Sequence, residues 1–566
     1  MKKTFYVLSL LLWALCPGKA SGQNDSYCYT LTRTLLQPDD SVGIAEIKYY
    51  NAKGDVWQSF LKGYTPTKKN LFTCTEYDGL GRESRTWLPV YSTQDYLIAS
   101  GLNSLASSQY GGDSYCYERV SYSNSPMDRV AARYAPGSAW NVHPSTTEYL
   151  FNTASGVLAC KRYEVGTSGG VTQSGNFASR TLRVTKTADE DGHSVYDFRD
   201  VDGETVLVRR VSGNTYYDTY YVYDDYGNLR YVLQPDYQDE PDLSLHAFCY
   251  TYDERGRCTE LKKPGAEAVY YTYDDNDLLL FSQDGLQRNS ARVTFYLYDH
   301  LHRLAIRGEC AAPSASDITN RSAICTYVEP GLGIGNCGYM ISFILPSPVL
   351  QLVNFYDDYS FRTGTGFNNT NFPAPVGNYS CGRKTGSIVY VPGQDTRLYK
   401  AYYYSMRGNL IREVSSNLRG GYDTTETTYS FTDRPSHSTH THTAQNAPTL
   451  TEAYDYTYDH ADRLTKVEHT FGGVKRTLLA HAYDELCRLS HTDYHGSSAN
   501  RLSYSYNTRG WLTAIISSPL ASITDYRTTS QRWVRSSRSG CHERWLSASS
   551  PSPNNGQWKA EGRPSN

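Results

Sequence analysis

The chain has 566 residues, which is enough for several ordinary domains or for one elongated repeat body. Its formal net charge of −3 and pI near 6.5 give no electrostatic case for a nucleic-acid partner. Tyrosine dominates the aromatic residues, with 52 Tyr against 16 Phe and 8 Trp. Because tyrosine favours strands and has an apolar body with a polar tip, this composition predicts half-buried sheet surfaces.

Residues 1–22 have the pattern of an export signal. Lys2 and Lys3 form a basic start, a short apolar run follows, and GKASGQ supplies the small residues of a cleavage region. We expect cleavage after Gly22, and hence a periplasmic, extracellular or cell-surface protein. The apolar run at 339–353 contains two prolines and is too short to cross a bilayer, so we expect no transmembrane segment.

A short phrase recurs from residue 48 to about 512. Each copy has an anchor tyrosine followed by Asp, Asn or, once, Ser, and seven of the ten copies have a second tyrosine two residues earlier. Tyr-x-Tyr has the period of a strand, so both rings lie on one face. The ten anchors are Tyr50, Tyr77, Tyr223, Tyr252, Tyr273, Tyr298, Tyr404, Tyr458, Tyr483 and Tyr506.

A turn is predicted after each anchor. Asp or Asn favours the first position of a type I turn, and three residues later six copies have Gly, which adopts left-handed backbone angles without strain. The other four copies have Asp277, His302, Asp462 or Cys487 there, and only the cysteine is of an unsuitable type. Each copy is therefore predicted to be a β-hairpin, and neighbouring hairpins must pair edge to edge because one alone is marginal.

Phrases such as YTYDERGR at 250–257 and YVYDDYGNL at 221–229 resemble the YD repeats of the Rhs, teneurin and insecticidal toxin-complex proteins. The resemblance covers about 190–515, with weaker copies at 48–85. SNSPMDRV followed by APGSAW is similar to an uncharacterised domain that precedes YD repeats in some exported bacterial proteins. The resemblance implies a spiralling sheet that forms a shell, which in the toxins encloses a C-terminal effector. The DPxG region of the self-cleaving members is absent from this sequence.

We therefore predict an all-β fold of stacked YD-repeat hairpins in a curved or spiralling sheet, a partial shell, with a β-rich N-terminal region. The tail is rich in Ser and Arg and contains no Tyr. Two interpretations of it remain open: a disordered natural tail and a truncated or frameshifted gene end. The predicted segments are the signal 1–22, the N-terminal domain 23–185 with two degenerate repeats, the repeats 186–308, a Cys-containing insertion 309–398, the repeats 399–526 and the tail 527–566.

The cysteines show no CxxC and no zinc-finger spacing. For an exported chain we expect disulfides, with the partners drawn from Cys310, Cys325, Cys337 and Cys381, although the sequence does not give the pairing.

Several short motifs resemble functional sites. GTSGG at 166–170 fits a nucleophile elbow but lacks a following helix, and GLGIG at 331–335 lacks a complete dinucleotide fingerprint. His440 and His442 would share one strand face, with His437 on the other, but no local carboxylate completes a metal site. DEDG at 189–192 and DVDG at 200–203 lack the final acidic residue of a calcium loop and favour hairpin turns. We therefore assign no catalytic, cofactor-binding or metal-binding residues.

Three hypotheses follow. The first is a non-enzymatic exported YD-repeat scaffold or shell, with a truncated Rhs-like toxin carrier as one form of it and a C-terminal effector, absent from this chain, as its partner. The second is a cell-surface module that binds carbohydrate or protein, because tyrosine-rich sheets stack on sugar rings. The third, weaker hypothesis is an enzyme within 100–190 or 310–400. A pair such as Asp253 and Arg257 recurs in the repeats, which favours a structural role.

Overall fold

A computed structural model describes residues 28–39, 42–97, 99–166, 169–313, 322–363, 366–517 and 523–525. The predicted signal at 1–22 and tail at 527–566 lie outside these residues. Within them, 33 strands form one sheet, and all the pairings between its strands are antiparallel. The predicted all-β fold is therefore confirmed. None of the helices in the described part of the chain is long and apolar enough to cross a membrane.

The N-terminal part contains one helix and nine strands. They are β1 (Tyr29–Leu35), β2 (Gly43–Tyr50), β3 (Val56–Lys62), β4 (Asn70–Tyr77), β5 (Glu83–Trp87), β6 (Val90–Ser92), α1 (Ala99–Gln109), β7 (Tyr117–Tyr122), β8 (Val130–Tyr134) and β9 (Ser145–Phe151).

The end of the predicted N-terminal domain and then the first repeat cluster follow. Their elements are β10 (Lys161–Val165), β11 (Val171–Asn176), β12 (Arg183–Ala188), β13 (Ser194–Arg199), β14 (Thr205–Ser212), β15 (Thr215–Tyr223), β16 (Leu229–Leu233), η1 (Pro235–Gln238), α2 (Leu243–His246), β17 (Ala247–Tyr252), β18 (Cys258–Lys262), β19 (Val269–Tyr273), β20 (Leu279–Gln283), α3 (Gly285–Asn289), β21 (Arg292–Tyr298) and β22 (Leu304–Ala311). Of these, β10, β11 and the first half of β12 belong to the predicted N-terminal domain.

The insertion and the second cluster complete the described chain. Their elements are β23 (Thr326–Tyr327), η2 (Ile334–Asn336), β24 (Tyr339–Met340), β25 (Val349–Tyr356), η3 (Ser360–Thr363), β26 (Lys384–Tyr390), β27 (Arg397–Tyr404), β28 (Leu410–Ser416), β29 (Tyr422–Tyr429), β30 (Pro435–His442), β31 (Leu450–Tyr458), β32 (Leu464–Phe471), β33 (Val474–Tyr483), β34 (Leu489–Tyr494), η4 (Ser498–Asn500), β35 (Arg501–Tyr506), β36 (Leu512–Ser517) and β37 (Ile523–Asp525).

The sheet is a meander in which strands that follow one another in sequence are paired. It runs from β1 to β5, continues through β7, β8 and β9 to β12, and then proceeds in chain order to β22. β22 pairs with β25, and the order then continues to β37. The hairpins β10–β11 and β23–β24 stand outside the main sheet.

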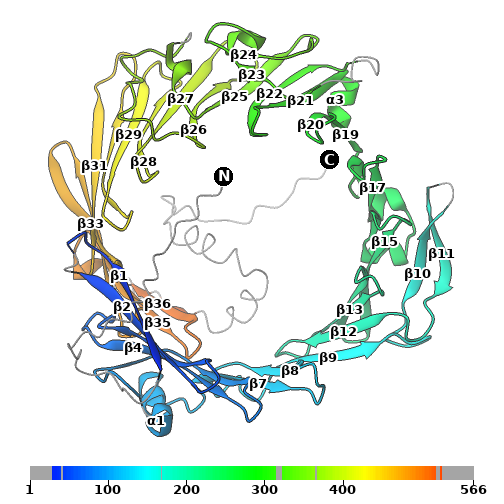
Figure 1. Cartoon of the computed structure of the whole chain (residues 1–566), viewed down its shortest axis with the longest axis vertical. Coiled ribbons are helices and arrows are strands. Elements are labelled where there is room, and N and C mark those ends of the chain that lie inside the picture. Colours follow the sequence, from blue (N-terminus) through cyan, green and yellow to red (C-terminus); the bar gives the residue numbers. More distant parts are fainter. Residues whose placement is uncertain are drawn as a thin grey trace, which may run out of the picture.

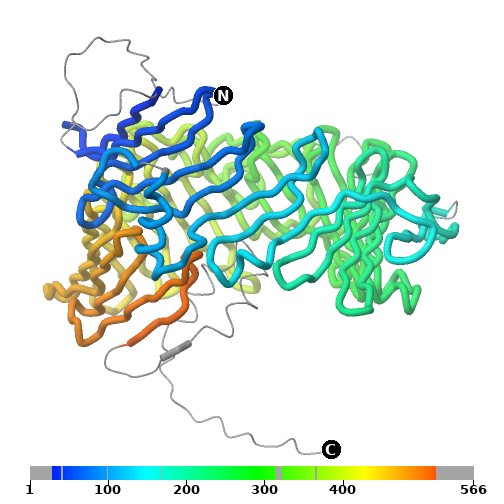
Figure 2. Tube along the Cα trace, turned by 90° about the horizontal axis from the view of Figure 1, so that it is seen from below, coloured from blue at the N-terminus to red at the C-terminus, as the bar shows by residue number. Residues whose placement is uncertain are grey.

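The meander bends into a ring (Figure 1), in which β1, β2 and β4 overlap β33, β35 and β36 in this view. In the side view the N-terminal strands are displaced along the ring axis from the C-terminal strands (Figure 2), so the sheet makes one turn of a spiral. A hydrogen bond between Thr508 and Asp113 joins the two ends of this turn. The predicted curved or spiralling sheet is therefore confirmed.

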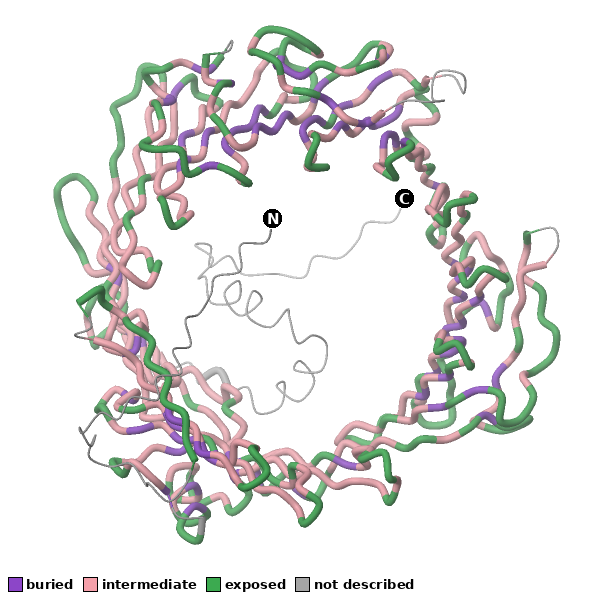
Figure 3. Tube along the Cα trace, in the orientation of Figure 1, coloured by how far each residue is buried: buried purple, intermediate pink, exposed green. Residues whose placement is uncertain are grey.

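Buried side chains form three separate clusters along the ring (Figure 3). One lies around Phe60 and Phe72 in the N-terminal part, and a second around Phe198 and Leu207. The third includes Phe295 and extends from β20 to β28, where the insertion covers the sheet. Elsewhere the wall is one sheet thick, so most of its side chains are only half-buried.

Candidate functional site: the repeat turns

The turn after each anchor tyrosine has one geometry. In the Tyr252 copy, one carboxylate oxygen of Asp253 accepts the backbone N–H groups of Arg255 and Arg257 at 3.0 and 2.9 Å. The N–H of Gly256 donates to the Asp253 carbonyl at 3.0 Å. All ten residues predicted to have left-handed backbone angles have φ between 60° and 90°, including Cys487 at 64°. The predicted turn chemistry is confirmed.

In eight of the ten predicted copies the anchor tyrosine joins its hairpin to the preceding one. The Tyr252 hydroxyl donates to the carbonyl of Leu229, the first residue of the returning strand before it, at 2.9 Å. This bond, which we call the tyrosine staple, recurs with O···O distances of 2.6–3.1 Å in the pairs Tyr77–Val56, Tyr122–Glu83, Tyr223–Thr205, Tyr273–Cys258, Tyr356–Leu304, Tyr404–Lys384, Tyr429–Leu410, Tyr458–Pro435, Tyr483–Leu464 and Tyr506–Leu489. Burial raises the pKa of the Tyr252 and Tyr458 hydroxyls, which keeps these donors protonated.

The arginine after the turn connects successive copies. Arg257 Nε lies 2.7 Å from the Asp253 carboxylate, and its guanidinium lies 5.1 Å from the centre of the Tyr273 ring in the next copy. Burial alone would raise the pKa of Asp253, but the N–H groups and guanidinium of Arg257 hold it below its usual value. The same Asp–Arg–Tyr arrangement occurs at Asp78–Arg82–Tyr122, Asp299–Arg303–Tyr356, Asp459–Arg463–Tyr483 and Asp484–Arg488–Tyr506.

These turns all lie on one rim of the ring. Because the meander reverses direction at each strand, the turns that follow anchor strands gather at one edge, the turn rim, which runs from residues 51–55 to 507–511. The links at the other strand ends, such as 63–69, 135–144 and 189–193, form the opposite edge, the connection rim. Ion pairs such as Arg255–Asp277 at 3.1 Å and Arg434–Asp462 at 3.0 Å join neighbouring turns along the turn rim.

The sequence pattern did not identify three further copies of the repeat. Tyr122, Tyr356 and Tyr429 all form the tyrosine staple. At Tyr356 the turn is interrupted by residues 358–382, yet the Asp357 N–H still donates to the Arg383 carbonyl at 3.0 Å. The YDD sequence at 356–358 was the available signal, but its arginine stands 26 positions beyond Asp357 in the chain.

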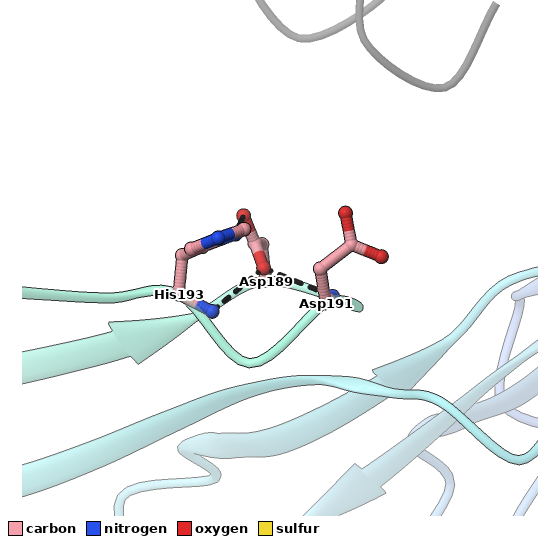
Figure 4. A group of neighbouring side chains, drawn as sticks. All are labelled: Asp189, Asp191 and His193. Carbon is pink, nitrogen blue, oxygen red and sulfur yellow. Dashed lines mark hydrogen bonds and ion pairs between the residues drawn. The ribbon is translucent and has the colours of Figure 1, made fainter. Parts of the chain in front are cut away.

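The carboxylates of DEDG also belong to a repeat-type turn. Asp189 accepts the backbone N–H groups of Asp191 and His193 at 2.9 and 3.0 Å, as Figure 4 shows, and Gly192 donates to the Asp189 carbonyl. Ligand atoms of Asp189, Asp191 and His193 lie within 4.8 Å of one another. In DVDG the Asp200 carboxylate likewise accepts the backbone N–H groups of Asp202 and Glu204. Both segments form hairpin turns, and the bonding of Asp189 is that of the anchor turns.

The three histidines lie on β30 and pair with neighbouring strands. His440 Nε2 lies 3.9 Å from the Asp423 carboxylate on β29, and His442 contacts the same carboxylate. His437 Nδ1 lies 2.6 Å from Asp455 on β31. Sequence reasoning missed Asp423 because the sheet pairing, and not the local spacing, brings it to the histidines. His440, His442 and Asp423 thus place two imidazoles and one carboxylate on two paired strands.

The two glycine motifs lie in connecting segments. GTSGG joins β10 to β11, so a strand and not a helix follows it, while Ser168 lies outside the described residues. GLGIG forms a turn that leads into η2. Neither motif has the strand–turn–helix setting that its chemistry requires.

The disulfide prediction is contradicted, because Cys310, Cys325, Cys337 and Cys381 are all free thiols. Three of them are buried in the core under the insertion, whereas Cys381 is exposed. Burial raises the pKa of Cys310 to about 11 and that of Cys337 to about 11, which suppresses the reactive thiolate.

A groove with a volume of about 750 Å³ lies beside β28, β29 and β30. Charged and aromatic side chains line it, among them Arg412, Glu426, Phe431 and His437. Arg412 and Glu426 form an ion pair across the two neighbouring strands, so part of this lining is already neutralised.

Comparisons with known proteins place the fold. Residues 28–153 match the model of a domain of unknown function, DUF6443. No curated protein matches the chain. The crystal structure of TcdB2-TccC3 is similar, with a TM-score of 0.55 and 12% identity over 86% of this chain and 22% of that chain.

Two further structures give the same result. The Photorhabdus luminescens Tc holotoxin pore has a TM-score of 0.54 and 13% identity over 86% of this chain and 21% of that chain. TcdB2-TccC3 without its hypervariable C-terminal region has a TM-score of 0.53 and 13% identity, with the same coverage. At these identities the likeness shows the fold: a toxin-complex-like β-sheet. The chain spans 21–22% of the length of the chains that it matches.

Proposed function

We propose that this chain is a non-enzymatic, exported wall segment of a YD-repeat shell that surrounds a polypeptide. One observation carries the proposal: the sheet makes a complete turn and its two ends are in contact. Tyrosine staples recur along the turn, and they suit a wall more than a reaction centre because they bind backbone carbonyls and leave no reactive group in common. The fold shared with toxin-complex structures supports the same proposal.

The enclosure of a polypeptide can be tested by fusing a peptide to the end of the chain. A flexible, protease-sensitive peptide fused after Asn566 should be cut more slowly than the same peptide fused to an unrelated soluble carrier. The wall slows cleavage because proteases are too large to pass between paired strands and can approach the tail only through the rims. Equal cleavage rates would refute the enclosure of a polypeptide.

Export is tested separately by the mass of the secreted protein. The predicted signal gives a mature chain that starts at Gln23. A full-length mass confined to the cytosol would contradict this part of the proposal without affecting the wall.

The groove beside β28–β30 favours carbohydrate binding as a second candidate function. Its volume of about 750 Å³ falls in the range of small-molecule sites, and Phe431 offers an aromatic ring beside charged groups. A panel of oligosaccharides should then raise the melting temperature of the wild type but not that of Phe431→Ala. No sugar-dependent shift in the wild type would exclude this candidate.

A further inference from the structure

The two ends of the spiral meet rim to rim. The turn rim of the last three repeats contacts the connection rim of the N-terminal part, within and just beyond the DUF6443 match. Lys69 Nζ lies 3.7 Å from Glu485 Oε2, and Thr508 Oγ1 donates to Asp113 Oδ2 at 3.1 Å. We call this contact the seam.

Arg509 forms the most enclosed part of the seam. Its guanidinium lies 4.3 Å from the centre of the Trp140 ring and 4.7 Å from that of Trp511. It also forms an ion pair with Glu190 at 3.1 Å and donates to the Pro136 carbonyl at 3.3 Å. Its side chain is only 8% exposed, so these interactions are shielded from water and are stronger than those of a surface ion pair.

The final repeat differs from the others at this place. Where five other copies have the arginine that stacks on the next anchor tyrosine, the Tyr506 copy has Trp511. At the position of Arg509, Arg255 and Arg407 reach the aspartate of the next turn. Arg509 contacts Trp140 and Glu190, where the arginines of other copies contact a carboxylate of the next turn.

We infer that the DUF6443-matched region is the closing segment of the ring. Trp140, in the 135–143 loop that contains APGSAW, contacts Arg509 in the turn of the Tyr506 copy. Asp113 contacts Thr508 in the same turn, and Lys69 contacts Glu485 in the turn before it. The region therefore starts the sheet and also contacts the turns of the Tyr483 and Tyr506 copies after one turn of the spiral, through Lys69, Asp113 and Trp140. This inference concerns closure alone and stands whatever the ring surrounds.

Zero-length carbodiimide cross-linking of the full chain tests the seam. The reagent joins an amine to a carboxylate only where they touch, so it should link Lys69 to Glu485 in the monomer fraction. The pair Lys186–Glu148, on neighbouring strands at 2.7 Å, serves as an internal standard of reaction yield. The ratio of the two linked peptides, measured by mass spectrometry, reports closure.

Charge reversal separates closure from folding. Arg509→Glu should lower the Lys69–Glu485 yield several-fold, and Glu190→Arg combined with it should restore much of that yield. Arg255→Glu, at the equivalent turn position of an inner copy, should leave the yield unchanged. Absence of the link from the wild-type monomer, its occurrence only in dimers, or an unchanged yield in Arg509→Glu would overturn the inference.

Discussion

Two stretches of the ring have the same hairpin repeat but are stabilised differently. From β20 to β28 the insertion folds over the sheet and buries a cluster that includes Phe295, Phe355 and Phe361. Among the described residues from β29 to β36, the only buried hydrophobic ones are Ala461 and Val467. The stretch from β29 to β36, which we call the bare stretch, depends on strand pairing, tyrosine staples and turn ion pairs. The repeat by itself therefore specifies the wall, and apolar burial adds stability only where a cover exists.

The largest expected effect lies in the covered stretch. Phe361 stacks on Phe355 with the ring centres 4.6 Å apart and is 2% exposed. Phe361→Ala should reduce the free energy of unfolding by about 3–5 kcal/mol, because it removes a buried ring and leaves a cavity. The half-exposed Phe471 on β32 is the matched control, and its replacement by Ala should cost less than about 1 kcal/mol. Equal losses in denaturant unfolding would erase the distinction between the two stretches.

A smaller effect is expected from a single staple in the bare stretch. Tyr458→Phe removes the hydroxyl that donates to Pro435 at 2.9 Å and should cost about 1 kcal/mol. Tyr456 lies on the same strand, and the described residues supply no partner for its hydroxyl. Tyr456→Phe should therefore be nearly neutral. If both variants unfold at the same denaturant concentration as the wild type, the staple contributes nothing.

Acid should weaken the bare stretch through its turn aspartates. Burial opposes the charged form of Asp459, but the guanidinium and N–H of Arg463 hold its pKa below the usual 3.8. A depressed pKa stabilises the fold above pH 3.8, and this contribution is lost as the pH falls through the folded value. The melting temperature should fall as the pH is lowered past about 4. The drop should be shallower in Asp459→Asn, and identical slopes would contradict this contribution.

The smallest expected effect is a gain. Cys487 has a left-handed φ of 64° in a position that other copies fill with Gly. Cys487→Gly should stabilise the chain by roughly 0.5–1 kcal/mol, because it relieves backbone strain that exceeds the entropy lost with glycine. Thermal unfolding of Cys487→Ala, which keeps the strain, provides the control. A lower melting temperature for the glycine variant would show that the thiol packing outweighs the strain.

Local chemistry made the hairpins predictable. Asp or Asn followed three residues later by Gly encodes the turn, and Tyr-x-Tyr encodes the strand before it, so the all-β repeat followed from short-range patterns. The substitutes His302 and Asp462 were predictable for the same reason. The tyrosine staple was not, because its acceptor is a backbone carbonyl in another hairpin and any residue supplies one.

The contacts that the sequence did not predict join residues that are far apart in the chain. Asp423 reaches His442 across a strand pair, and Arg509 reaches Glu190 across 319 positions of the chain. The interrupted turn at Tyr356 hides its arginine behind an insertion. The disulfide prediction failed because cysteine content and an export signal give no positions, and three of these cysteines are free thiols that pack in one apolar core.

Small-angle X-ray scattering of the purified chain shows whether the sheet closes into a ring in solution. A closed single-turn ring gives a scattering profile with a deficit of short internal distances and a compact maximum dimension. We expect this closed-ring profile for the wild type and a larger maximum dimension for Arg509→Glu. A wild-type profile of an extended, open arc would contradict the closed wall.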